Sequence, residues 1–301
     1  MSDAHRGSSV ESRFSRGAPR GKRPLTEIPR SAATAVGCLA LASALTACTP
    51  GRTPQQPAAS GSPSTSSGSA APSSSGAPEA AGDVFDGAVI GIDPGHNAGN
   101  AGAPEVINKQ VWNGRSKSPC NTTGTATDDG YPETDFTWAV ANKLAADLRE
   151  AGAEVVMTRD GNDGVGPCID KRAKIINDAK ADVAIDIHAD GAAESERGFS
   201  LLIPVRSGTN DKVVQPSRDY AEMLRTEMKK TGMPLATYLG EGGFVKRDDL
   251  AGLNLTTVPQ VLLETGNMRN AEDARLLKSD KFHAETAAAI MRAMAAYLRS
   301  R

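Results

Sequence analysis

Residues 89–100 read VIGIDPGHNAGN, a short apolar run that leads into a glycine-rich turn. Val89, Ile90 and Ile92 favour a strand, and the Pro-Gly pair that follows favours a sharp bend. His96 comes directly after this pair, and it is one of only four histidines in the chain. The stretch therefore predicts a strand whose following turn carries either a solvated histidine or a metal ligand.

Short β-branched runs alternate with amphipathic stretches through the rest of the chain. Strands are predicted at 88–93, 153–158, 182–188, 198–204 and 260–264. Helices are predicted at 133–150, 169–179, 216–231, 271–278 and 281–299. Because helices of this length separate the strands, we expect a single α/β domain with a mostly parallel central sheet covered by helices on both faces.

The first 48 residues are typical of an export signal. Residues 1–30 are basic, and residues 31–48 are apolar, uncharged and rich in small side chains, as in secretory signals. The end of this leader, LTAC, resembles the bacterial lipobox, in which the cysteine, here Cys48, is lipidated. A plain signal peptide cut near Ala47 and an uncleaved anchor are the alternatives.

Residues 49–82 form a Pro/Ser/Gly/Ala tract with no aromatic side chain. Such a composition cannot bury enough apolar surface to offset the entropy of ordering, so we expect a disordered linker. As a random coil it would span roughly 30 Å. The folded domain is then expected at 83–301.

The charge balance argues against nucleic acid as a partner. The chain has 34 Lys/Arg and 36 Asp/Glu, of which the first 48 residues hold seven and three, leaving a net charge of −6 on the rest. An acidic domain without a basic stripe lacks the charge that phosphate backbones require.

Cys120 and Cys168 are the only cysteines outside the leader. In an exported protein an even pair favours a disulfide. Closing this loop would stabilise the fold by about 4 kcal/mol, an upper-range figure in the chain-entropy model. Two buried thiols or soft metal ligands are the alternatives, although zinc cysteines usually come in C-x-x-C pairs, which are absent.

Four polar residues stand at matching ends of the predicted elements. His96 and His188 follow or end predicted strands, and the carboxyl ends of parallel strands meet at one edge of a sheet. Glu133 opens the helix after Pro132, where its alternative role is to favour the helix dipole. Two histidines and a carboxylate suit an open zinc site. Glu264 ends the last strand, and a carboxylate there can move protons.

The motifs that carry these residues are IGIDPGHNAG, the glutamate that opens the next helix, DVAIDIHAD and VPQVLLETGNMRN. With them the chain, from about residue 87 to 298, resembles the zinc-dependent N-acetylmuramoyl-L-alanine amidases of bacterial cell walls, in an actinobacterial form. The resemblance implies that His96, Glu133 and His188 bind one Zn²⁺ and that Glu264 is catalytic.

The resemblance also implies a substrate and a location. The substrate would be peptidoglycan or muropeptides, cut by zinc-activated water at the amide between N-acetylmuramic acid and the L-alanine of the stem peptide. We expect a monomer in the cell envelope, held at the membrane only by the leader or a lipid anchor, or else secreted.

Five further residues have assigned roles with plainer alternatives. Asp93 and Asp186 are candidates for orienting the histidines, since metal-bound imidazoles need such partners. Leu250 and Asn254 lie in a loop that matches the family and are candidates for holding the stem peptide. For these four, structural roles are the alternative. We expect His283 on the surface of the last helix.

Two rival functions remain open on the sequence. One is another zinc hydrolase of cell-wall peptides, such as a carboxypeptidase or a deacetylase. The other is an inactive relative that binds peptidoglycan or activates another enzyme.

Overall fold

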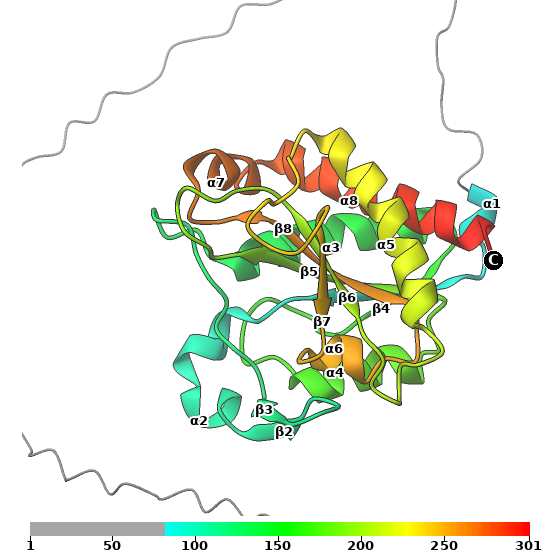
Figure 1. The fold of residues 1–301 in the computed structure, drawn as a ribbon, viewed down its shortest axis with the longest axis horizontal. Coiled ribbons are helices and arrows are strands. Elements are labelled where there is room, and N and C mark those ends of the chain that lie inside the picture. The colour runs from blue at the N-terminus through cyan, green and yellow to red at the C-terminus, as the bar shows by residue number, and fades with distance from the viewer. Residues whose placement is uncertain (1–81) are drawn as a thin grey trace, which may run out of the picture. The chain divides into compact units, whose positions relative to one another are not determined.

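The computed structural model describes residues 82–301, and the leader with Cys48 and residues 49–81 of the linker lie outside them. In this part of the chain a six-stranded sheet has the order β4-β1-β5-β8-β6-β7 (Figure 1). Its strands are β1 (Val89–Pro94), β4 (Glu154–Met157), β5 (Val183–Asp190), β6 (Ser200–Pro204), β7 (Phe244–Arg247) and β8 (Gln260–Asn267). The first four strands in this order are parallel, while β6 runs antiparallel to β8 and β7 runs parallel to β6. The sheet is mostly parallel, as the sequence predicts.

Helices cover both faces of the sheet. The α-helices are α1 (Gly82–Phe85), α2 (Pro104–Ile107), α3 (Glu133–Glu150), α4 (Ile169–Asp178), α5 (Val214–Met228), α6 (Ala251–Asn254), α7 (Ala271–Leu277) and α8 (Asp280–Arg299). Two 3-10 turns, η1 (Ala98–Gly102) and η2 (Lys229–Thr231), accompany them. None of the helices in residues 82–301 has the length and apolar character needed to cross a bilayer.

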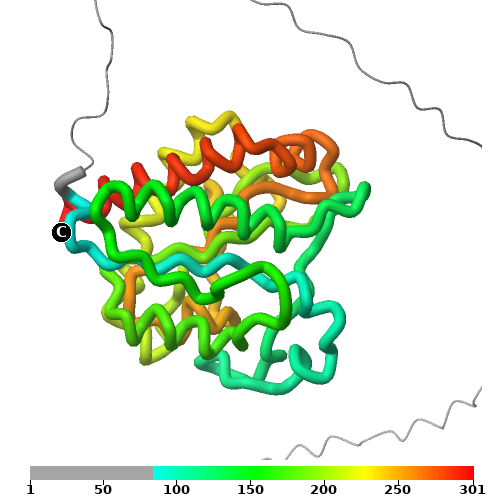
Figure 2. The backbone as a smooth tube through the Cα atoms, turned by 180° about the vertical axis from the view of Figure 1, so that it is seen from behind, coloured from blue at the N-terminus to red at the C-terminus, as the bar shows by residue number. Residues whose placement is uncertain are grey.

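The two faces of the sheet are covered differently. Helices α3, α5 and α8 lie over one face and bury the large hydrophobic core (Figure 1). The other face carries α4, α6 and a small hairpin, β2 (Gln110–Trp112) with β3 (Lys117–Pro119). Figure 2 shows α3 and α4 on opposite sides of the sheet. Only two small apolar clusters form on the α4/α6 face within the described residues, so this face has room for a polar site.

Side-chain alternation directs the polar residues to this second face. On β5, Ile185 and Ile187 join the large core, so Asp186 and His188 point the other way. His188 is the register partner of Glu264 on the neighbouring strand β8. The histidine and the glutamate are therefore side by side on the α4/α6 face.

Most predicted elements are present, with small differences in their ends. Helix 133–150 has the predicted bounds. Strands β5 and β8 run on to Asp190 and Asn267, so His188 and Glu264 lie inside strands rather than at their last residues. The short strands β2, β3 and β7 are not among the predicted ones. Runs of three or four residues show little periodicity, and of the strands this short only β4 is predicted.

His283 is not on the surface, contrary to the prediction. Its side chain is buried in α8, with Nε2 2.6 Å from the carbonyl oxygen of Leu277. Its ring packs edge-on against Phe136 of α3, with the ring centroids 5.6 Å apart. The polar ring is tolerated inside because its nitrogen has a hydrogen-bond partner.

The predicted disulfide joins Cys120, just after β3, to Cys168, just before α4. The amide of Ile169 also donates to the carbonyl of Cys120 at 2.8 Å. The hairpin and the loop that follows it are thus fastened to the start of α4.

Replacing both cysteines by alanine should lower the free energy of unfolding, by up to about 4 kcal/mol, since the unfolded chain regains the entropy of an open loop. Urea denaturation of the oxidised protein and the double variant measures the difference. Reduced wild-type protein serves as the control and should resemble the variant. Equal stability of oxidised and double-variant protein would contradict a stabilising role.

Candidate metal and catalytic site

His96 lies in a turn whose backbone is held by hydrogen bonds from a buried arginine. Its φ of 58° lies in the left-handed region, which few residues other than glycine adopt. The buried guanidinium of Arg172 donates to the carbonyls of Pro94 at 2.8 Å and of His96 at 2.9 Å. It also pairs with the carboxylate of Asp93 at 2.6 Å. The unusual backbone is at His96 itself, and Arg172 fixes it.

The ring of His96 is oriented by the loop that follows Cys120 in the chain. Its Nδ1 lies 3.2 Å from the carbonyl oxygen of Thr122 and 3.1 Å from the hydroxyl of the same residue. Since a carbonyl oxygen only accepts, Nδ1 carries the proton. The lone pair is then on Nε2, which faces Glu133 at 3.3 Å.

Glu133 is the first residue of α3, and its side chain is 3% exposed. Its Oε2 accepts a hydrogen bond from the amide of Thr125 at 2.9 Å. Its Oε1 is 2.8 Å from Nδ1 of His188 and 3.2 Å from the amide of Ala189. Gly124 passes so close that a Cβ there would lie 3.0 Å from Oε2. The carboxylate is therefore fixed on both sides.

His188 projects from β5 with both ring nitrogens engaged. Nδ1 faces Glu133, and Nε2 lies 3.2 Å from Oδ1 of Asp186. The ring lies against Gly95, where an added Cβ would be 2.3 Å from Cε1 of His188. The glycine of the turn is needed for this close approach rather than for its backbone angles.

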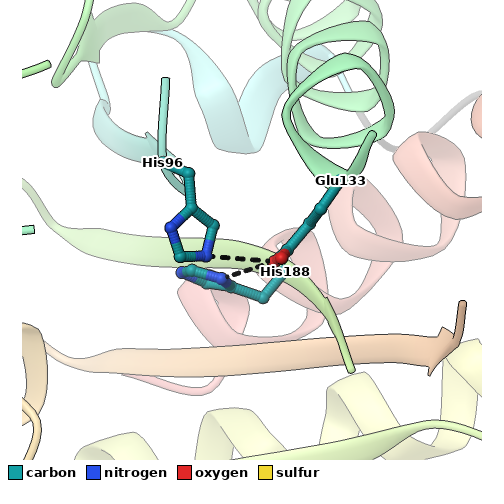
Figure 3. A group of neighbouring side chains, drawn as sticks. All are labelled: His96, Glu133 and His188. Atoms are coloured by element: carbon teal, nitrogen blue, oxygen red, sulfur yellow. Dashed lines mark hydrogen bonds and ion pairs between the residues drawn. The ribbon is translucent and has the colours of Figure 1, made fainter. Parts of the chain in front are cut away.

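The three side chains bring one ligand atom each to a common point (Figure 3). These atoms, from His96, Glu133 and His188, all lie within 4.8 Å of one another. A set of two imidazoles and one carboxylate matches the protein ligands of catalytic zinc sites, which leave a fourth position open. The residues present therefore fit a metal ion.

The electrostatics of this group also favour a cation. Burial by itself would raise the pKa of Glu133, but His96 and His188 hold that pKa well below its usual range. Burial by itself would lower the pKa of His188, but Asp186 and Glu133 raise it well above its usual value. The carboxylates thus attract positive charge to the point where the ligand atoms meet, and a bound metal would compete there with protons.

The two aspartates predicted to orient the histidines have different surroundings. Asp186 does contact His188, as described above. Asp93 contacts neither histidine: it accepts from Arg172 and, at 2.5 Å, from the hydroxyl of Thr158. Asp93 therefore does not orient a histidine by direct contact, because its carboxylate is paired with a buried arginine 79 residues further along the chain, which in turn donates to the carbonyl of His96.

Glu264 lies beside His188 on the same face of the sheet. Burial raises its pKa to about 8, helped by the nearby negative charges of Glu133, Asp190 and Asp186 and opposed by His188. Its Oε2 is buried and has no hydrogen-bond partner among the described residues. An unpartnered buried carboxyl oxygen is costly, and such groups gather at functional sites.

Glu264 and the two histidines line a cavity of about 360 Å³ on the α4/α6 face. Leu250 is in its wall. Asn254 is not: its side-chain nitrogen donates to the carbonyls of Asn113 at 3.0 Å and Asp248 at 2.8 Å. The structure therefore contradicts a substrate contact by Asn254, which instead ties α6 to the hairpin.

A family model described as N-acetylmuramoyl-L-alanine amidase matches residues 90–296. The chain belongs to this family. An N-acetylmuramoyl-L-alanine amidase of Mycobacterium tuberculosis is 36% identical to this amidase over 219 residues, which are 70% of this chain and 87% of that protein.

Two solved structures show the same fold. The N-acetylmuramyl-L-alanine amidase Ami1 of Mycobacterium smegmatis is 39% identical, with a TM-score of 0.68 over 72% of this chain and 99% of that one. The apo form of Ami1 from Mycobacterium abscessus is also 39% identical, with a TM-score of 0.65 over 71% and 99%. The expected family and fold class are thereby confirmed.

Several residues that build the site were not found from the sequence. Arg172 and Thr122 hold the turn and the ring of His96. Gly95 is expected from the sequence only as part of a bend, and its role in making room for His188 was missed. Each acts through a neighbour that is distant in the chain, so no local pattern marks it. Arg172 lies in a helix among other charged residues, so the sequence gives no sign that its side chain is buried.

Replacing Gly95 by alanine in this amidase should lower zinc affinity at least about tenfold, because the new methyl group displaces the ring of His188 from Glu133. Competition with a chromogenic chelator measures the affinity.

Gly102→Ala is the matched control, since nothing lies within 4 Å of a Cβ there. Thermal melting checks that both variants fold. Unchanged zinc affinity in folded Gly95→Ala would contradict the packing argument.

Proposed function

We propose that this amidase hydrolyses the amide between N-acetylmuramic acid and the L-alanine of the peptidoglycan stem peptide. In this proposal His96, Glu133 and His188 hold Zn²⁺, and Glu264 is the catalytic acid and base. The observation that carries it is Glu264, which lines the cavity beside His188, one of the three converging ligands, and whose buried Oε2 has no hydrogen-bond partner among the described residues.

The metal supplies Lewis-acid chemistry: Zn²⁺ polarises a carbonyl and lowers the pKa of water. Neighbouring residues of the chain hold the three metal ligands in their orientations. Thr122 fixes the tautomer of His96, and Asp186 sits behind His188, the type of outer partner that orients metal-bound imidazoles. Glu133 is anchored by the amide of Thr125.

Glu264 has the position and the proton affinity for both halves of an amide hydrolysis. As a base it takes a proton from the attacking water, and as an acid it gives that proton to the departing nitrogen of L-alanine. Acid–base catalysis works best when the pKa lies near the working pH. Burial raises the pKa of Glu264 above that of an ordinary glutamate, which makes its carboxylate a stronger proton acceptor.

The location follows from the leader. We propose export to the cell envelope, with Cys48 lipidated and residues 49–82 as the tether between membrane and cell wall. The lipobox-like LTAC and the polar composition of the linker support this. The domain would act as a monomer, since the metal ligands and Glu264 all come from one chain.

Replacing Glu264 by glutamine should reduce digestion of purified sacculi at least about a hundredfold, because the amide keeps the shape but cannot take up the proton. Zinc should stay bound, since the three ligands are untouched. Peptide release is followed by mass spectrometry, and zinc by elemental analysis.

The wild-type digest should contain intact stem peptides that begin with L-alanine. Glu105→Gln, an exposed glutamate of α2, is the matched control and should digest normally. Retained activity in Glu264→Gln would sink the assignment of Glu264. Release of free amino acids or acetate alone would instead indicate a carboxypeptidase or deacetylase, and no release from wild type would indicate a binding protein.

A further inference from the structure

Two arginines line the cavity, and only one of them has N–H donors that are not already used in hydrogen bonds. The guanidinium of Arg172 is 4% exposed, and its three nitrogens donate to backbone carbonyls and to the side chains of Asp93 and Asn97. Arg172 is committed to holding the turn of His96. It is therefore unavailable to a ligand.

Arg247, the last residue of β7, is placed differently. Its Nε and Nη2 donate to the two carboxylate oxygens of Asp249, at 2.7 and 2.6 Å. Nη1 has no hydrogen-bond partner among the described residues, and the side chain is 35% exposed. Asp249 thus binds one edge of the guanidinium. The second edge, formed by Nη1 and the outer proton of Nη2, is left to donate to a ligand.

A fixed arginine fork suits a carboxylate. Arginine binds carboxylates through two parallel N–H donors, and these charge-assisted bonds are among the strongest in proteins. Because Asp249 already holds Nε and Nη2, little further ordering is needed when a ligand arrives.

The residues that line the cavity determine which way round a bound substrate would lie. Leu202, Leu262 and Leu250 line it with apolar surface. Asp186 and Glu264 line the cavity near His188, and their negative charges disfavour a second carboxylate close to them. Asp249 also lines the cavity, but its charge is paired with the guanidinium of Arg247. A ligand with its scissile amide at the metal end would therefore direct any carboxylate toward the arginine.

We infer that Arg247 binds a free carboxylate of the stem peptide and thereby makes this amidase selective for stems that are not amidated. The inference rests on the proposed function, and it specifies that the preferred stem peptide carries a free, negatively charged carboxylate. Arg247 acts in binding, away from the reacting atoms, so its loss should weaken turnover only on substrates that carry the carboxylate.

The test compares purified sacculi before and after carbodiimide coupling with ammonia, which converts stem carboxylates to amides. Wild-type protein should release peptides from native sacculi at least about tenfold faster than from amidated sacculi, the loss expected for one charge-assisted pair. Arg247→Gln should lower the rate on native sacculi by a similar factor and leave the rate on amidated sacculi unchanged.

Arg218→Gln is the matched control, because it removes the same charge from an exposed position on α5 that is outside the cavity. It should retain the wild-type preference. Arg247→Lys keeps a charge without the fork and should retain part of the preference, which separates recognition from a failure to fold.

Three results would overturn the inference. The first is equal wild-type rates on native and amidated sacculi. The second is an equal loss on both substrates in Arg247→Gln and Arg247→Lys. The third is wild-type digestion of neither substrate, which overturns the proposed function as well and is thereby distinguished from the other two.

Discussion

A buried ion pair between Arg172 of α4 and Asp93 of β1 holds the turn that carries His96, one of the three proposed metal ligands. Both side chains are almost fully buried, with 4% and 6% exposed. Removing one partner of such a pair commonly costs about 3–5 kcal/mol, because the other charge is left uncompensated. Here the same guanidinium also binds the carbonyls on either side of the bend. Fold stability and the position of His96 thus depend on one side chain.

The asymmetry of the sheet explains how so many polar groups are tolerated together. The large core on the α3/α5/α8 face supplies most of the apolar burial, and hydrophobic burial is the main favourable contribution to folding. The α4/α6 face carries Asp186, His188 and Glu264 in adjacent strands. Burial disfavours the charged form of Glu264 and raises its pKa, whereas the carboxylates of Asp186 and Glu133 stabilise the charged form of His188 and raise its pKa. A metal ion would offset the cost of burying these groups by binding the carboxylate of Glu133 and the imidazoles.

The sequence predicts five of the six strands of the main sheet and the residues that converge, but not β7 or the hairpin of β2 and β3. Alternation and helical periodicity predict those five strands and helix 133–150, and a parallel sheet then brings His96, His188 and Glu264 to one region. Prediction failed where a residue's partner is distant in the chain. Asp93 is paired with Arg172 rather than a histidine, and Asn254 is turned inward to the hairpin. His283 is buried because α8 packs on α3, which its own helix does not reveal.

The account's central claim is that His96, Glu133 and His188 form a single zinc site. Diffraction from crystals of the zinc-loaded domain, recorded on both sides of the zinc absorption edge, tests this most directly. The account predicts one strong anomalous peak bonded to Nε2 of His96, Oε1 of Glu133 and Nδ1 of His188, at about 2.0–2.2 Å from each. A peak bonded to other residues, or no peak in crystals grown with zinc, would contradict it.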